Sequence, residues 1–373
     1  MIIKGLAGFR FYITRIISVI IILNTSPAES KDIPEEQIHS PALKNEKKFN
    51  AKEFLFDHIR DAHEWHIFTY RDKHVSLYLP VILISRETGI VIFSSKKFHH
   101  GYSSYNYKGY KYKLELEGEN KGKIIECSES SSFTIPFDIS ITKNIVSLFF
   151  SIILLTWIFI SAANLYKKNR GRPPKGLQSF IEPIIIFVRD DIARQSIGEK
   201  KFEKFTPYLL TVFFFIWINN MLGIIPIPPG GANLTGNIAV TGVLAFFTLI
   251  VTNLSGNKNY WKHIFNTPGV PIWLKIPPVM PLIELFGVFT KPVVLMIRLF
   301  ANITAGHLIT LGFLTLIFVF GEKSPTVGFI VSPLSIVFIL FMMFLELLVA
   351  FIQAFVFTFL SALYIGMAVE EHH

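Results

Sequence analysis

Cysteine and charged residues are scarce in this chain, and each scarcity excludes a class of structure. The single cysteine, Cys127, excludes an intrachain disulfide and any metal site built from cysteines. Only 17% of the 373 residues are charged, whereas 51% are hydrophobic and 37 are phenylalanines. The hydrophobic residues come in blocks long enough to cross a bilayer, so the sequence predicts a polytopic membrane protein.

Motifs for nucleotide binding and nucleophilic catalysis are also missing, since the sequence holds no P-loop, no GxGxxG and no nucleophile elbow. "HEWH" (63–66) has its histidines three apart instead of the four that HExxH requires. We interpret it as a surface histidine cluster, with an adventitious metal site as the alternative. The net charge of +9 resides largely in the N-terminal half and in short loops beside apolar segments, as the positive-inside rule expects. We therefore predict no cofactor, no metal and no nucleic-acid partner.

The N-terminus resembles a secretory signal. Three basic residues precede a short apolar core at 16–23, and "SPA" (26–28) offers small residues for cleavage. An uncleaved anchor helix is the alternative, but the apolar run is short for a membrane span. We predict a signal peptide at 1–30, which would place the following residues outside the cytoplasm.

Residues 31–136 predict a small β-rich extracytoplasmic domain. "VSLYLPVILIS" and "GIVIFSSKKF" are rich in β-branched and aromatic residues, and "RETG" between them is typical of a hairpin turn. "YNYKGYKYKLELEG" alternates as a half-buried strand does. The polar stretch "CSESSS" is the expected linker to the membrane domain at 137–373.

The second half predicts an all-α membrane domain with about five transmembrane helices and one interfacial amphipathic helix. Basic clusters at "KKNRGRPPK" and "NKNYWKH" mark the cytoplasmic side, and five spans then place the C-terminus in the cytoplasm. The sequence shows no internal repeat, which argues against many transporter folds. The expected spans are 145–166, 208–227, 236–254, a proline-rich segment from 273 to about 320, and 329–368, with the amphipathic helix at 176–198.

Arg298 lies in the middle of an apolar segment, where a charge costs roughly 2.5–3.5 kcal/mol on insertion scales. Glu284 and Arg298 are separated by two heptads and share a helical face with Asn302, whereas His307 lies roughly opposite. Pro292 is expected to interrupt the hydrogen-bond ladder of this helix just before Arg298. Arg298 has no acidic neighbour within its own turn, so its partner must lie on another helix or another chain. The alternative is a structural arginine paired with Glu346.

Two further polar residues, Glu346 and Gln353, lie seven apart in the last apolar run and so share a helical face. A carboxylate and an amide in such a run need partners inside the helix bundle or in water. For Gln353 and Asn302 alone, an interhelical hydrogen bond without further function is an equal alternative.

The segment "KPVVLMIRLFANITAGHLI" (291–309) resembles the signature of subunit a of F-type ATP synthases, with its Lys-Pro, Arg-Leu-Phe, Asn and Ala-Gly. "NNMLGIIP" (219–226) and the tail "IQAFVFTFLSALYIGMAVEEHH" (352–373) are also similar to that family. The resemblance covers about residues 137–373. The long β-rich extension before the first span departs from the family pattern.

This resemblance implies a stator proton-channel subunit of the F0 sector, not catalytic by itself, in a bacterial inner membrane. Protons would cross through two offset half-channels and ride between them on carboxylates of a rotating c-ring. The other implied partners are the peripheral-stalk subunit b, the rest of the F1F0 complex and the lipid bilayer. The implied site residues are Arg298 as the rotor-facing charge, and Glu284, His307, Glu346, Asn302, Gln353 and Asn220 along the proton pathway, with His307 and Glu346 as a relay pair.

Two other classes of function compete with this interpretation. A cation-coupled secondary transporter with a soluble sensor domain predicts substrate uptake by this chain alone and repeated halves in its sequence. An envelope binding protein anchored by its spans leaves Arg298, Glu346 and Gln353 unexplained. Copurification with a ring of small two-helix proteolipids would distinguish the ATP synthase subunit from both.

Overall fold

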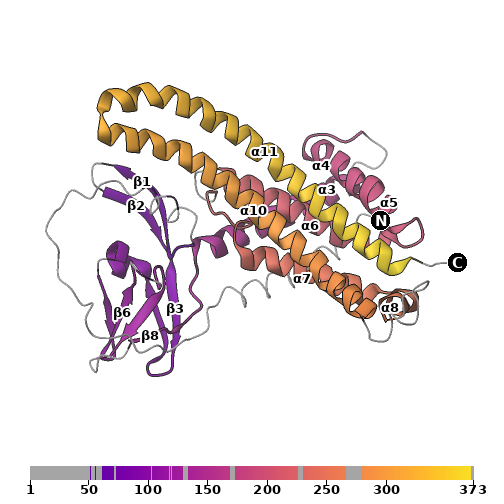
Figure 1. The fold of residues 1–373 in the computed structure, drawn as a ribbon, viewed down its shortest axis with the longest axis horizontal. Helices are drawn as coiled ribbons and strands as arrows, with labels where there is room; N and C mark the ends of the chain where they lie inside the picture. The colour runs from indigo at the N-terminus through magenta and orange to yellow at the C-terminus, as the bar shows by residue number, and fades with distance from the viewer. Residues whose placement is uncertain are drawn as a thin grey trace.

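The computed structural model describes residues 61–70, 73–101, 103–116, 118, 120–128, 133–168, 173–225, 230–265 and 279–370, with the single positions 51 and 55. A β-rich region stands beside a bundle of helices (Figure 1). The predicted signal peptide at 1–30 lies outside the described residues. Five helices are long and apolar enough to cross a membrane, so the predicted fold class is confirmed.

Each predicted span corresponds to one of these helices. The predicted amphipathic segment at 176–198 forms a short helix, a π-helical stretch and a last helical turn. The segment "NKNYWKH" adds a short helix on the side of the bundle where the C-terminus lies (Figure 1). The helices are α3 (Lys143–Lys168), α4 (Leu177–Ile186), η3 (Phe187–Arg194), α5 (Gln195–Ile197), α6 (Phe202–Ile224), α7 (Ile238–Ser255), α8 (Lys258–Phe265), α10 (Val279–Lys323) and α11 (Pro325–Val369).

The last two helices form a long hairpin. Pro292 lies inside the continuous helix α10, which loses one backbone donor there, as expected for an interruption of its hydrogen-bond ladder. The chain reverses direction within "GEKSPTVG", where a turn was expected, although all but Ser324 of this stretch is helical. The helices meet directly because Gly328 lies against Gly321, where an added Cβ would come 2.6 Å from the Gly321 Cα.

The helices of this hairpin are longer than an upright membrane span. Each helix has 45 residues. At about 1.5 Å per residue such a helix is roughly 67 Å long, more than twice the ~30 Å hydrocarbon core of a bilayer. Helices fully embedded in the bilayer would therefore lie about 60° from its normal. Upright helices would instead extend beyond the hydrocarbon core.

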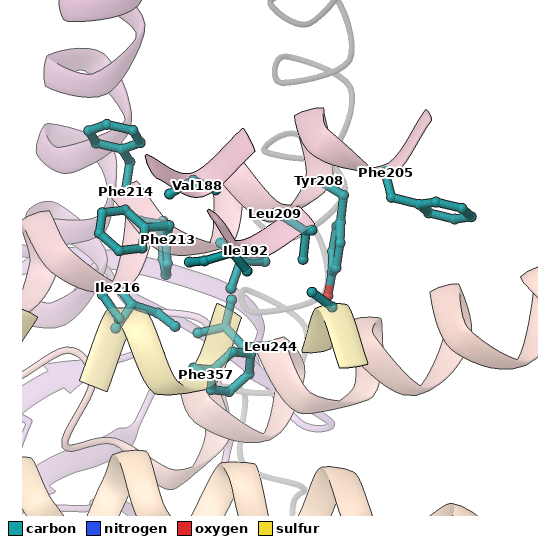
Figure 2. Packing of buried hydrophobic residues seen from close by; sticks show 14 of the residues in the cluster. Val188, Ile192, Phe205, Tyr208, Leu209, Phe213, Phe214, Ile216, Leu244 and Phe357 are labelled. Atoms are coloured by element: carbon teal, nitrogen blue, oxygen red, sulfur yellow. The ribbon is translucent and has the colours of Figure 1, made fainter. Parts of the chain in front are cut away.

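Helix α6 lies at the centre of the bundle, and its buried aromatic and aliphatic side chains hold the other helices in place. Figure 2 shows Phe213 and Ile216 of α6 packed among Ile192 of η3, Leu244 of α7 and Phe357 of α11. By contrast, only 6% of the most apolar stretch of α10 is buried within the chain, and 11% of that of α11. The outer faces of the hairpin are therefore available to lipid or to another subunit.

The β-rich region confirms the predicted hairpin and corrects one predicted strand. Strands β3 and β4 flank "RETG", and β9 pairs with the other edge of β3. "YNYKGYKYKLELEG" is two strands instead of one, because Lys108 and Gly109 both have positive φ and make a tight turn. The strands are β1 (Glu64–Tyr70), β2 (Lys73–Tyr78), β3 (Pro80–Ser85), β4 (Gly89–Ser94), β5 (Tyr105–Tyr107), β6 (Tyr110–Leu114), β7 (Ile124–Cys127), β8 (Phe133–Thr134) and β9 (Phe137–Asp138), with the 3-10 helix η2 (Ser95–Gly101).

Two backbone hydrogen bonds attach this β-rich region to the first span, and a contact between His63 and Asp138 of β9 lies beside them. His63 Nε2 lies 2.7 Å from Asp138 Oδ2, just before α3 begins. The backbone N–H of Lys143 donates to the carbonyl of Ala62 at 3.1 Å, and that of Asn144 donates to the Asp61 carboxylate at 3.2 Å. The His63 side chain is only 10% exposed, so its interpretation as a surface histidine is wrong. No group of three or more metal-ligating side chains occurs among the described residues.

The His63–Asp138 contact predicts that residues 61–64 are held against β9 in a pH-dependent way. Burial alone would raise the pKa of Asp138, but the hydrogen bond and charge of His63, with hydrogen bonds from Ser140, outweigh it and hold that pKa below its usual value. A depressed pKa stabilises the folded state above the unfolded value of about 3.9, and this stabilisation is lost as the pH falls through the folded value. We expect Asp138→Asn to speed amide exchange at residues 61–64 roughly tenfold at pH 7. After correction for intrinsic rates, the difference from the wild type should shrink as the pH falls through the folded pKa of Asp138; a difference that does not shrink with falling pH contradicts this role.

Candidate functional site

A cavity of about 320 Å³ lies where α6, α10 and α11 meet. It brings together side chains that are far apart in the sequence and otherwise surrounded by apolar residues. Five of the seven predicted site residues line it, namely Asn220, Asn302, His307, Glu346 and Gln353. The predicted polar positions on three separate helices therefore converge on one space.

His307 and Glu346 face each other across the α10–α11 hairpin. His307 Nδ1 lies 3.6 Å from Glu346 Oε1, and the two side chains are 19% and 11% exposed. Thr310, one turn beyond His307 on α10, donates from Oγ1 to the same Glu346 oxygen at 3.0 Å. The expected contact between His307 and Glu346 is thus present, and Thr310 is a polar partner that the sequence analysis did not identify.

His307 also reaches toward α6. A Cβ added to Gly223 would lie 4.0 Å from His307 Nε2, so the imidazole spans the space between α11 and α6. Because one ring nitrogen faces a carboxylate and the other faces the second helix, the ring can accept a proton on one side and release it on the other.

Asn220 is fixed in the wall of the cavity by two hydrogen bonds. Its Nδ2 donates to the carbonyl of Ala350 at 3.2 Å, and its Oδ1 accepts from Thr235 Oγ1 at 2.6 Å. Asn220 and Gln353 are buried, whereas Asn302 is exposed on the hairpin surface. The two asparagines therefore have different positions. Asn220 connects α6 to α11 by a hydrogen bond, whereas Asn302 lies at the open side of the cavity.

Arg298 does not line the cavity. It lies nine residues before His307, or about 13 Å along α10. Within the described parts of the chain it makes no hydrogen bond and no ion pair, so pairing with Glu346 does not hold it in place. The positive charge of Arg298 interacts electrostatically with the hydroxyl group of Tyr364 on α11. Arg298 itself is half-buried, between the exposed Ile297 and the buried Leu299.

Glu284 lies on the other side of Arg298, 14 residues away, or about 21 Å along α10. Burial of Tyr260 on α8, together with the negative charge of Glu284, raises the pKa of Tyr260. The predicted ionisable groups therefore lie at two places along α10, with Glu346 of α11 beside His307. His307 and Glu346 lie on one side of Arg298, and Glu284 lies on the other.

Gly306 allows Glu346 to approach α10 closely, which gives a testable consequence. A Cβ at Gly306 would lie 3.0 Å from Glu346 Oε1 and 3.1 Å from its Cγ, so an alanine there must push the carboxylate away. Overpacking of this kind costs typically 1–3 kcal/mol, and we expect Gly306→Ala to reduce proton movement through the assembled protein several-fold. Gly312→Ala on the same helix is the matched control, since its Cβ would meet nothing within 4 Å. Equal effects of both substitutions in a vesicle proton-uptake assay would contradict this role of Gly306.

Comparison with known proteins defines the class. Residues 145–366 match the family described as ATP synthase A chain. This match covers more than half of the sequence and all five candidate spans in whole or in part. The chain belongs to the ATP synthase A chain family.

Particular relatives agree with this assignment. The chain is 42% identical over 244 residues to ATP synthase subunit a of Chloroherpeton thalassium, which is 63% of this chain and 69% of that protein. It is 45% identical over 238 residues to ATP synthase subunit a 2 of Chlorobaculum tepidum, covering 62% and 64%. It is 40% identical over 241 residues to ATP synthase subunit a of Myxococcus xanthus, covering 63% and 75%.

The N-terminal region matches a different family. Residues 54–148 correspond to a domain of unknown function, DUF8433. This match runs through the β-rich region and ends inside α3. The boundaries predicted at 30 and 136 remain predictions.

Proposed function

We propose that this chain is the stator subunit through which protons cross the F0 sector of an F-type ATP synthase. Family membership supports the general role, and one observation carries the finer mechanism. Arg298 is a half-buried charged side chain without a hydrogen-bond or ion-pair partner in the described chain, and it lies along α10 between two separate groups of ionisable residues. Such a charge is costly in lipid unless a partner or water reaches it, so a carboxylate supplied by another subunit fits this position.

The proposed partner of Arg298 is the carboxylate of each c subunit as the rotor turns past α10 and α11. A nearby positive charge favours the ionised form of a carboxylate. Arg298 would therefore make an arriving protonated carboxylate give up its proton on one side and accept a new one only after it has passed. The same charge repels protons, so it separates the two half-channels electrically.

The two groups of ionisable residues are the proposed halves of the path. The cavity with His307 and Glu346 serves one half-channel, and the region of Glu284 and Tyr260 serves the other. The separation of 3.6 Å between His307 Nδ1 and Glu346 Oε1 is longer than a hydrogen bond, so a small rotation or one water molecule would complete a proton transfer between them.

The proposed orientation follows the charged loops. The C-terminus and the basic clusters after α3 and around α8 would lie in the cytoplasm, and the β-rich region outside it. His307 and Glu346 lie toward the hairpin end of α10 and α11, while Glu284 lies near α8, so the relay pair would serve the outer half-channel. The chain would contact the c-ring along the exposed hairpin, would join the peripheral stalk subunit b and would carry no catalytic site itself. Replacing Arg298 in the assembled complex tests this proposal.

A further inference from the structure

We infer that Thr310 is a positioning residue for proton relay, which holds one oxygen of Glu346 so that the other stays available to exchange a proton. This inference rests on the proposed function of the His307–Glu346 pair. Thr310 Oγ1 lies 3.0 Å from Glu346 Oε1, the same oxygen that faces His307 Nδ1 at 3.6 Å. A hydroxyl has a single hydrogen, and here that hydrogen is directed to the carboxylate.

The behaviour of Thr310 differs from that of its neighbours on α10. A threonine in an apolar helix usually donates to the carbonyl four residues before it. Thr315 does so, with its Oγ1 2.6 Å from the carbonyl of Leu311. Thr310 instead donates across the hairpin to a side chain of α11. This donor is therefore used to hold Glu346 and is not occupied by its own helix.

Three residues of α10 together form a seat for the Glu346 carboxylate. Gly306 leaves room for Oε1 and Cγ, Thr310 donates to Oε1, and His307 approaches the same oxygen from beside it. These positions follow the spacing of three to four residues that puts side chains on one face of a helix. Oε2 has no hydrogen-bond partner within the described chain, and Glu346 lines the cavity. The seat thus fixes one oxygen and leaves the second to the cavity.

The consequence concerns geometry during turnover. Glu346 has three rotatable side-chain bonds, so without an anchor its carboxylate can leave His307 after each proton transfer. A hydrogen bond to a charged group is strong enough to favour the seated conformation roughly tenfold or more. Removing the hydroxyl should therefore slow proton transfer. Thr310→Val should not unfold the bundle, because valine has nearly the same shape as threonine.

The test compares Thr310→Val, Thr310→Ser and the matched control Thr315→Val in the assembled ATP synthase. ATP-driven proton uptake is measured in inside-out membrane vesicles, and ATP hydrolysis and the amount of assembled complex are measured in parallel. We expect Thr310→Val to reduce proton uptake about tenfold. Thr310→Ser, which keeps the donor, should stay within about twofold of the wild type, as should Thr315→Val.

Two results would overturn this role of Thr310. Proton uptake by Thr310→Val equal to that of Thr315→Val would show that the hydroxyl does not matter. Equal loss in Thr310→Ser and Thr310→Val would show that the methyl group matters instead. Glu346→Gln, measured beside them, separates this inference from the proposed function. If Glu346→Gln takes up protons at the wild-type rate, the proposed relay is wrong. If Glu346→Gln loses uptake while Thr310→Val keeps it, only the positioning role of Thr310 is wrong.

Discussion

Replacing Arg298 by alanine should abolish ATP-driven proton uptake in vesicles while the complex still assembles. The arginine has no hydrogen-bond or ion-pair partner in the described chain, so its removal leaves no charge of this subunit unpaired and should spare the bundle. It removes, however, the positive charge that would ionise each arriving rotor carboxylate. Losing a partner of a buried charge pair costs about 3–5 kcal/mol, which corresponds to a fall in proton uptake of at least roughly a hundredfold.

A second readout distinguishes this role from a loss of assembly. If Arg298 also separates the half-channels, vesicles carrying Arg298→Ala should show a higher passive proton leak than wild-type vesicles. The matched control is Lys323→Ala, which removes a positive charge from the exposed end of the same helix. Near wild-type uptake by Arg298→Ala would make the arginine structural and the proposed mechanism wrong. Equal loss in both variants would mean that net charge on α10 matters, and not the position of Arg298.

The sequence predicted the class and the polar residues of the site because both leave strong patterns. Spans of about 20 apolar residues are read directly from composition, and a charge inside one of them is conspicuous. Periodicity could not predict that Asn220, His307 and Glu346 converge on one cavity. A periodic pattern shows only which residues share a face of the same helix. It became an expectation through the family resemblance, which related positions on different helices.

Other features escaped prediction for local reasons. Thr310 carries no signal of its own, because a threonine in an apolar helix most often bonds to its own backbone. The split of the "YNYKGYKYK" strand depended on the "KG" dipeptide, in which Lys108 adopts a positive φ that its residue type seldom shows. The contact of His63 with Asp138 joins residues 75 positions apart and could not be read from spacing.

Replacing Glu346 by glutamine should reduce ATP-driven proton uptake by roughly ten- to a hundredfold, because the amide keeps the shape of the carboxylate but cannot carry a proton between His307 and the cavity. His307→Ala should give a loss of similar size. If the two side chains act as one relay, the double variant should be no worse than the more severe single variant, since the second change removes a step that is already lost. Glu370→Gln, at the exposed end of α11, is the matched control and should leave uptake unchanged. Losses that multiply in the double variant would show that His307 and Glu346 act independently. In that case the 3.6 Å between them would be a packing contact, and each of the two would contribute to a separate step of the proton path.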